Sequence, residues 1–172
     1  VDASGSMGGD KWRNTMTAVV AICKAASMIS GLDVVVSFRT THYASSRNGQ
    51  PLVAIGFDSR VDKFRKIENL WPSLHPGGTT PEGLCYEAIM KDFVGGNNNR
   101  DSYFLNFSDG QPMFSGDGFE YYGDSALHHT KKQVKEIIKK GISVMSYFVG
   151  DSEYDRTRNM DDFKTMYGKD AE

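Results

Sequence analysis

Residues 103–110 read YFLNFSDG, an apolar strand that runs directly into a polar turn. A helix is expected at about 125–140, and Gly141 ends it before a further strand at 142–149. A strand, a helix and a second strand in this order are typical of a parallel pair joined by a crossover. This region therefore indicates an α/β fold.

The rest of the chain continues the alternation. Apolar residues at helical spacing predict a helix over 11–30, and further helices are expected at 61–70, 81–93 and 157–167. Strands are predicted at 32–38 and 52–57, with Asn48-Gly49 as the turn of a hairpin or edge pair. The whole pattern predicts a three-layer Rossmann-like sandwich with a mostly parallel central sheet and one antiparallel edge strand.

Composition narrows the class of protein. The chain has 172 residues, a formal net charge of -2 and 39% hydrophobic residues, which suits one globular domain over 1–172 and excludes a disordered chain. Without a basic excess we expect no nucleic-acid partner, and without a long apolar run we expect no membrane partner and a cytoplasmic location. The two cysteines, Cys23 and Cys85, are interpreted as buried free thiols.

The beginning of the chain is unusual, because Val1 leads at once into the polar run DASGSM. Such a run normally follows a buried strand. We therefore expect most of the first strand to lie upstream of Val1, and the chain to be a fragment of a longer one that continues after Glu172.

Five oxygen-bearing side chains are candidates for one site at the carboxyl ends of the strands, where ligands of α/β sheets bind. They are Asp2, Ser4, Ser6, Thr79 and Asp109. Hydroxyl and carboxylate oxygens are typical ligands of Mg²⁺, with Mn²⁺ or Ca²⁺ as alternatives, whereas zinc would need His or Cys. A cation held mostly by neutral hydroxyls stays electrophilic, so the set predicts a docking site for an acidic group of a partner protein.

These motifs resemble those of von Willebrand factor A-type domains, whose metal-ion-dependent adhesion site is written Asp-x-Ser-x-Ser, then Thr, then Asp. The matching stretches are DASGS at 2–6, GGT at 77–79 and SDG at 108–110. The resemblance implies direct metal ligation by Ser4, Ser6 and Thr79, with Asp2 and Asp109 acting through water or hydrogen bonds. Thr80 is the alternative to Thr79.

Within that family the motifs are most similar to intracellular prokaryotic and phage members, and the SFRTT stretch at 37–41 is similar to the corresponding domain of cobalt-chelatase subunits. That resemblance implies a non-catalytic subunit that works beside an AAA+ ATPase in an ATP-dependent complex. It does not imply an enzyme.

Three other functions remain open from the residues alone. Asp2 with Ser108 resembles the motifs of haloacid-dehalogenase-type phosphatases, although Ser4 stands where those enzymes need a second carboxylate. Ser6, Asp109 and His128 or His129 follow the order of a serine-hydrolase triad, but Ser4 replaces the glycine of the nucleophile elbow. The third alternative is a structural component with a vestigial metal site.

The loop over 111–123 carries Met113, Phe114, Phe119, Tyr121 and Tyr122 next to the predicted metal site. Apolar side chains on such a loop are typical of a partner-binding rim. Packing against the domain's own sheet is an equally strong interpretation.

Overall fold

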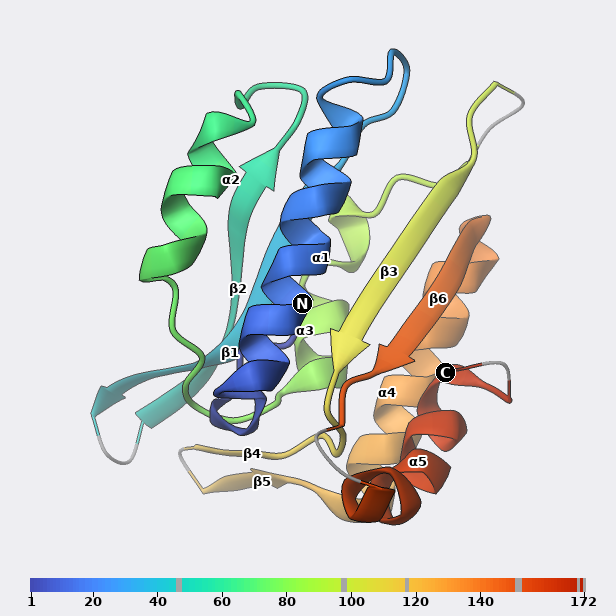
Figure 1. Ribbon diagram of the computed structural model, residues 1–172. Helices are drawn as coiled ribbons and strands as arrows, with labels where there is room; N and C mark the ends of the chain where they lie inside the picture. The colour runs from blue at the N-terminus through green and yellow to red at the C-terminus, as the bar shows by residue number, and fades with distance from the viewer. Residues whose placement is uncertain (46–47, 97–98, 117, 151–152, 170, 172) are drawn as a thin grey trace.

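The computed structural model describes residues 1–45, 48–96, 99–116, 118–150, 153–169 and 171 (Figure 1). The α-helices are α1 (Asp10–Ala26), α2 (Arg65–Leu70), α3 (Glu82–Ala88), α4 (Gly123–Lys139) and α5 (Glu153–Tyr167). The strands are β1 (Val35–Ser45), β2 (Asn48–Asp58), β3 (Ser102–Ser108), β4 (Phe114–Gly116), β5 (Phe119–Tyr121) and β6 (Ile142–Phe148). Short 3₁₀ turns cover Gly5–Met7, Trp71–Ser73 and Met90–Asp92.

The predicted three-layer Rossmann-like sandwich with a mostly parallel central sheet is wrong. In the described part of the chain the strands form three two-stranded sheets. β1 pairs with β2 and β4 pairs with β5, both antiparallel, and β3 pairs with β6 in parallel. The parallel pair expected from 103–149 is therefore present, but it is not part of a larger parallel sheet.

The two pairs do not join into one sheet because the segment between β1 and β3 consists of residues 1–3 alone. The backbone N–H of Arg39 donates to the carbonyl of Val1 at 3.0 Å, and Ala3 donates to Arg39 at 2.9 Å. The N–H of Asp2 donates to the carbonyl of Phe107 on β3 at 2.9 Å. This segment makes one isolated parallel bridge, Asp2 with Arg39, which is too short to form a strand that joins the two pairs.

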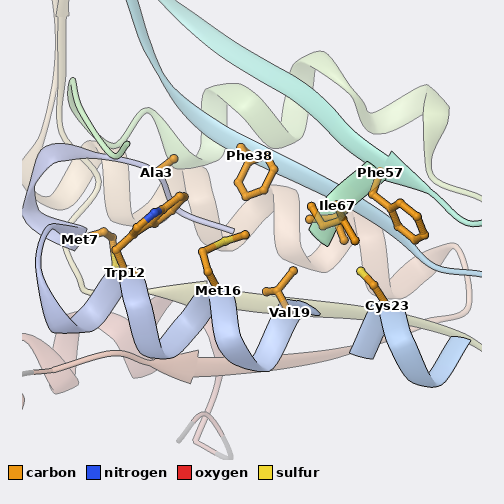
Figure 2. Close-up of a cluster of buried hydrophobic side chains, with 10 residues drawn as sticks. Ala3, Met7, Trp12, Met16, Val19, Cys23, Phe38, Phe57 and Ile67 are labelled. Carbon is orange, nitrogen blue, oxygen red and sulfur yellow. The ribbon is translucent and has the colours of Figure 1, made fainter. Parts of the chain in front are cut away.

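A hydrophobic core lies between α1 and the β1–β2 pair (Figure 2). Trp12, Met16 and Val19 project from one face of α1 at helical spacing towards Phe38 of β1. The side chains that complete this cluster come from the first residues, the later part of α1, β1, β2 and α2, and they are Ala3, Met7, Cys23, Val36, Phe57 and Ile67. This packing fixes the N-terminal segment against the start of α1.

A second core lies on the α3, α4 and α5 side of the β3–β6 pair. Tyr86 of α3 packs with Val134 and Ile137 of α4 and with Ile142 of β6. Behind β3 and β6, Figure 1 shows α4 running alongside the two strands. Cys85, like Cys23, is a buried free thiol, as predicted.

Candidate metal centre

Asp2 is fully buried between the β1–β2 and β3–β6 pairs. Its carboxylate Oδ1 accepts a hydrogen bond from the backbone N–H of Ser4 at 2.9 Å, and Oδ2 accepts one from the hydroxyl of Ser108 at 2.9 Å. Because both oxygens already accept hydrogen bonds, Asp2 acts as a fixed negative charge that holds the turn carrying Ser4. It offers a cation negative charge and a fixed orientation.

Ser4, Ser6 and Asp109 continue the same chain of contacts. Ser4 immediately precedes the 3₁₀ turn Gly5–Met7, and its Oγ lies 3.0 Å from the Oγ of Ser6. The Ser6 hydroxyl donates to Oδ1 of Asp109 at 2.9 Å, across 103 positions of sequence. Four of the five predicted site residues are therefore joined by hydrogen bonds, and Ser6 is the exposed member.

The glycine loop before Thr79 is bonded to the same turn. The N–H of Gly77 donates to the carbonyl of Ala3 at 2.8 Å, and the N–H of Gly5 donates to the carbonyl of Gly78 at 3.0 Å. Gly78 has a φ of 75°, and a Cβ there would lie 2.8 Å from the carbonyl oxygen of Thr41. Only glycine lets this loop approach β1 so closely.

Thr79 is brought to this edge without joining the hydrogen-bonded chain. Its Oγ1 lies 2.6 Å from Oγ1 of Thr41 on β1. Within the residues that the structure describes, its side chain has no hydrogen bond to Ser4, Ser6 or Asp109. Thr79 is half-buried, whereas Thr80 is buried, so Thr79 is the more accessible of the two hydroxyls.

A cationic side chain also belongs to the site. The Nζ of Lys11, on the first turn of α1, lies 3.0 Å from Oδ2 of Asp109, and both side chains are almost buried. Burial raises the pKa of Asp109 above its ordinary value, while the hydrogen bond from Lys11 acts in the opposite direction. The nearby charge of Asp2 also raises that pKa.

The oxygen atoms of these side chains are the kind of ligand that a small hard cation binds. Among the residues that the structure describes, no three His, Cys, Asp or Glu side chains cluster in a way that could hold a metal, so a cation here would need hydroxyl ligands as well. Two neighbouring ligands of an octahedral Mg²⁺, each about 2.1 Å from the metal, lie about 3.0 Å apart. The Ser4 and Ser6 hydroxyl oxygens are 3.0 Å apart.

A buried ion pair behind the site links β1 to the beginning of α3. Arg39, whose backbone pairs with residues 1 and 3, donates through Nη2 to Oε1 of Glu82, the first residue of α3. Tyr86 donates to the same oxygen at 3.1 Å, and the Tyr86 and Tyr167 hydroxyls are 2.7 Å apart. Burial pushes the pKa of Arg39 down, but Glu82 together with Tyr86, Asp2 and Tyr167 outweighs this effect and holds the pKa above its ordinary value.

Three of these contacts were missed from the sequence. Ser108 was grouped with Asp109 as a polar strand end, but its bond to Asp2 was not foreseen. Lys11 stands in no motif, and Thr41 belongs to the SFRTT stretch at 37–41 but is not a candidate for the site, so both reach the site only through the fold. A lysine at the beginning of a helix, where the helix dipole disfavours a positive charge, was the available signal for Lys11.

The apolar loop over 111–123 divides into buried and exposed side chains, and position 117 lies outside the described residues. Phe114 and Tyr121 are buried against Ala126 of α4. Met113 and Phe119 are more than half exposed, at 55% and 51%. The N–H of Met113 donates to the carbonyl of Thr80 at 2.9 Å, which places this exposed side chain beside the threonine loop.

No family model matches this chain. No curated protein matches it either. Among solved structures, the fold is similar to that of part of the pilus adhesin SpaC from Lactobacillus rhamnosus GG, with a TM-score of 0.63, 13% sequence identity and 96% of this chain covered. The open conformation of the same adhesin gives a TM-score of 0.60 at 13% identity, also over 96% of this chain. The chain spans about a quarter of the adhesin's length, 26% and 25% in the two structures, and the likeness establishes a shared fold alone.

Proposed function

We propose that this chain is a metal-dependent adhesion module of the von Willebrand factor A type. It binds Mg²⁺ through Ser4, Ser6 and Thr79, with Asp2 and Asp109 as the supporting carboxylates. Through the metal it binds an acidic residue of a protein partner, and it performs no chemistry of its own.

The observation that carries the proposal is the chain of hydrogen bonds from Asp2 through Ser4 and Ser6 to Asp109. Hydroxyl oxygens at the spacing of two neighbouring Mg²⁺ ligands, flanked by two carboxylates, form a preorganised site for a hard cation. A hydroxyl can also donate its hydrogen to a carboxylate while its lone pairs face a cation. The Ser6–Asp109 bond is compatible with that arrangement.

Charge supports an acidic partner. The site contains two carboxylates, Asp2 and Asp109, and one ammonium, Lys11, so the protein side chains bring a formal charge of about -1 when all three are ionised. A bound divalent cation would then leave the site positive. An incoming Asp or Glu carboxylate is a hard oxygen ligand that completes the coordination and neutralises that charge.

The neighbouring apolar side chains supply a contact surface for such a partner. Met113, Phe119 and Tyr122 are exposed on the segment that follows Asp109. Exposed apolar and aromatic residues beside a charged site are typical of protein–protein interfaces. We infer that the partner presents its acidic residue next to an apolar surface.

The two hydrolase alternatives receive less support. Asp2 is fully buried with both carboxylate oxygens accepting hydrogen bonds, which is unsuitable for a nucleophile that must attack a phosphate. His129 contacts Tyr121 and Gln133, and His128 contacts the carbonyl of Asp124, so in the described residues neither is bonded to Ser6 or Asp109. A base that must activate Ser6 would lie within hydrogen-bond reach of it.

The cellular setting that we propose is a cytoplasmic complex with an AAA+ ATPase, in which this module is a non-catalytic subunit. The support for it is the resemblance of the sequence motifs to cobalt-chelatase subunits. Among the described residues, no helix is both long enough and apolar enough to cross a membrane.

Manganese binding tests the proposal, because Mn²⁺ reports its own binding by electron paramagnetic resonance. We expect the wild-type chain to bind one Mn²⁺ that Mg²⁺ displaces, and Ser4→Ala to weaken binding at least about tenfold, or about 1.4 kcal/mol. Ser27→Ala, an exposed serine after α1, is the matched control and should bind like wild type. A wild-type chain that binds no Mn²⁺ would leave only a vestigial site.

The partner class is tested with a displayed library of random peptides, selected on the wild-type chain in Mg²⁺ and again in chelator. The expected binders all contain Asp or Glu and are lost in chelator and with Ser4→Ala. Binders that lack an acidic residue, or that bind equally in chelator, would refute the adhesion role.

A further inference from the structure

Lys11 contacts one of the two carboxylates of the candidate metal site. Its Nζ lies 3.0 Å from Oδ2 of Asp109, and the two side chains are only 10% and 6% exposed. The other oxygen of this carboxylate, Oδ1, accepts the hydroxyl of Ser6 at 2.9 Å. Asp109 therefore has both oxygens engaged, one by an ammonium and one by a hydroxyl.

The position of Lys11 is unfavourable for the helix that carries it. Lys11 is the second residue of α1, where the exposed N–H groups give the helix a partial positive charge. A positive charge at the beginning of a helix is repelled by the partial positive charge there. The contact with Asp109 offsets this repulsion, so the ammonium is placed by the site and not by helix propensity.

The Lys11 ammonium lowers the net negative charge that attracts a divalent cation to the site. Without Lys11 the site would hold two negative charges, from Asp2 and Asp109, and with it the net charge is halved. Because these groups are mostly buried, solvent and salt screen the effect much less than at the surface. A cation that approaches Asp109 must compete with, and be repelled by, a positive charge that is already there.

We propose that Lys11 is a resident cation of the site, which holds Asp109 in the metal-free protein and sets the affinity for the divalent ion by opposing it. This rests on the proposed metal-binding function. Lys11 keeps metal binding weak and reversible, and it leaves more of the bound ion's charge for an acidic partner. It is a residue that tunes affinity, and it is not a metal ligand.

The experiment compares Mn²⁺ dissociation constants, measured by electron paramagnetic resonance, for wild type, Lys11→Gln and Lys11→Arg. Lys11→Gln removes the charge and should tighten Mn²⁺ binding at least about tenfold, or about 1.4 kcal/mol. Lys11→Arg keeps the charge and should stay within about threefold of wild type, or about 0.7 kcal/mol. Arg13→Gln removes a positive charge from the same helix turn, at a side chain that is 66% exposed, and should leave the affinity unchanged.

Thermal unfolding of the same proteins separates this role from a structural one. Metal-free Lys11→Gln should unfold at a lower temperature than wild type, because Asp109 loses its counter-ion, and saturating Mn²⁺ should close that gap. A purely structural role would lower both temperatures equally, which would overturn the proposal.

Failure of the Lys11 proposal is distinguishable from failure of the metal site. If wild type binds Mn²⁺ and folded Lys11→Gln binds it equally or more weakly, the Lys11 proposal is wrong and the metal site stands. If neither wild type nor any folded variant binds Mn²⁺, the proposed function and the Lys11 proposal are both wrong.

Discussion

Substitution of Glu82 by Gln should destabilise this domain far more than an ordinary charge removal. The side chains of Glu82 and Arg39 are 0% and 5% exposed, and Nη2 of Arg39 donates to Oε1 of Glu82. Glutamine keeps the shape and an accepting oxygen, but it removes the negative charge. Arg39 would then be a buried cation without its counter-ion.

The size of the effect follows from that burial. Removal of one partner of a buried ion pair typically costs about 3–5 kcal/mol, because the remaining charge stays desolvated. A domain of this size has a free energy of unfolding of about 5–15 kcal/mol, so the loss would be a large fraction of it. With a shift of about 2–4 °C per kcal/mol, we expect the Tm to fall by about 6–20 °C.

Urea unfolding followed by circular dichroism measures this directly, with an unchanged dependence on urea as the sign of an unchanged fold. Glu87→Gln is the matched control on the same helix, because that side chain is 62% exposed, and it should change stability by less than about 0.5 kcal/mol. The double variant Arg39→Met/Glu82→Leu should recover most of the loss. A cost below about 1 kcal/mol for Glu82→Gln would refute the reasoning, since that is the range of a surface pair.

Two further predictions concern the metal site. Burial raises the pKa of Asp109, so the carboxyl group binds its proton more tightly in the folded metal-free protein than in the unfolded chain. The folded protein should therefore lose stability as the pH rises from the pKa of the unfolded chain through the higher pKa of the folded state. Mg²⁺ needs the ionised form, so the rise in Tm caused by Mg²⁺ should grow over the same pH increase; a pH-independent rise would contradict this. Thr79→Ala should weaken Mn²⁺ at least about tenfold, or about 1.4 kcal/mol, while Thr80→Ala should only lower stability in urea; the reverse would assign the ligand to Thr80.

Helices and the parallel strand pair were predictable because their patterns are local. The apolar face of α1 repeats at helical spacing, and the helix expected at 11–30 is found at Asp10–Ala26. The strands expected at 103–107 and 142–149 are β3 and β6, in register from Ser102 with Ile142. Buried strands and amphipathic helices carry their periodicity in the residues themselves.

The extent of the strands and their separation into two-stranded sheets were not predictable from such patterns. The expected hairpin is present, because β1 pairs antiparallel with β2, but the strand predicted at 32–38 begins at Val35 and runs on to Ser45. Asn48 and Gly49, expected to form the turn, are instead the first residues of β2. The outer residues of β1, His42 and Tyr43, are exposed, so no apolar alternation marks this half of the hairpin. The β4–β5 hairpin has only three residues in each strand, below the length at which periodicity is recognisable.

The site could be predicted only in part, for a physical reason. Oxygen-bearing side chains next to strand ends mark where a cation would bind, and the structure brings Asp2, Ser4, Ser6 and Asp109 together. The sequence could not reveal that Lys11 contacts Asp109, or that the hydroxyl of Thr79 is bonded to Thr41. Such pairings depend on how separate elements approach, which no local spacing encodes.

A crystal of this protein grown with Mn²⁺, measured for anomalous scattering, would locate the metal itself. We predict one anomalous peak about 2.0–2.3 Å from the hydroxyl oxygens of both Ser4 and Ser6, and no peak there in a Ser4→Ala crystal. A crystal grown in saturating Mn²⁺ that shows only water between these two hydroxyls would contradict the metal-dependent adhesion site.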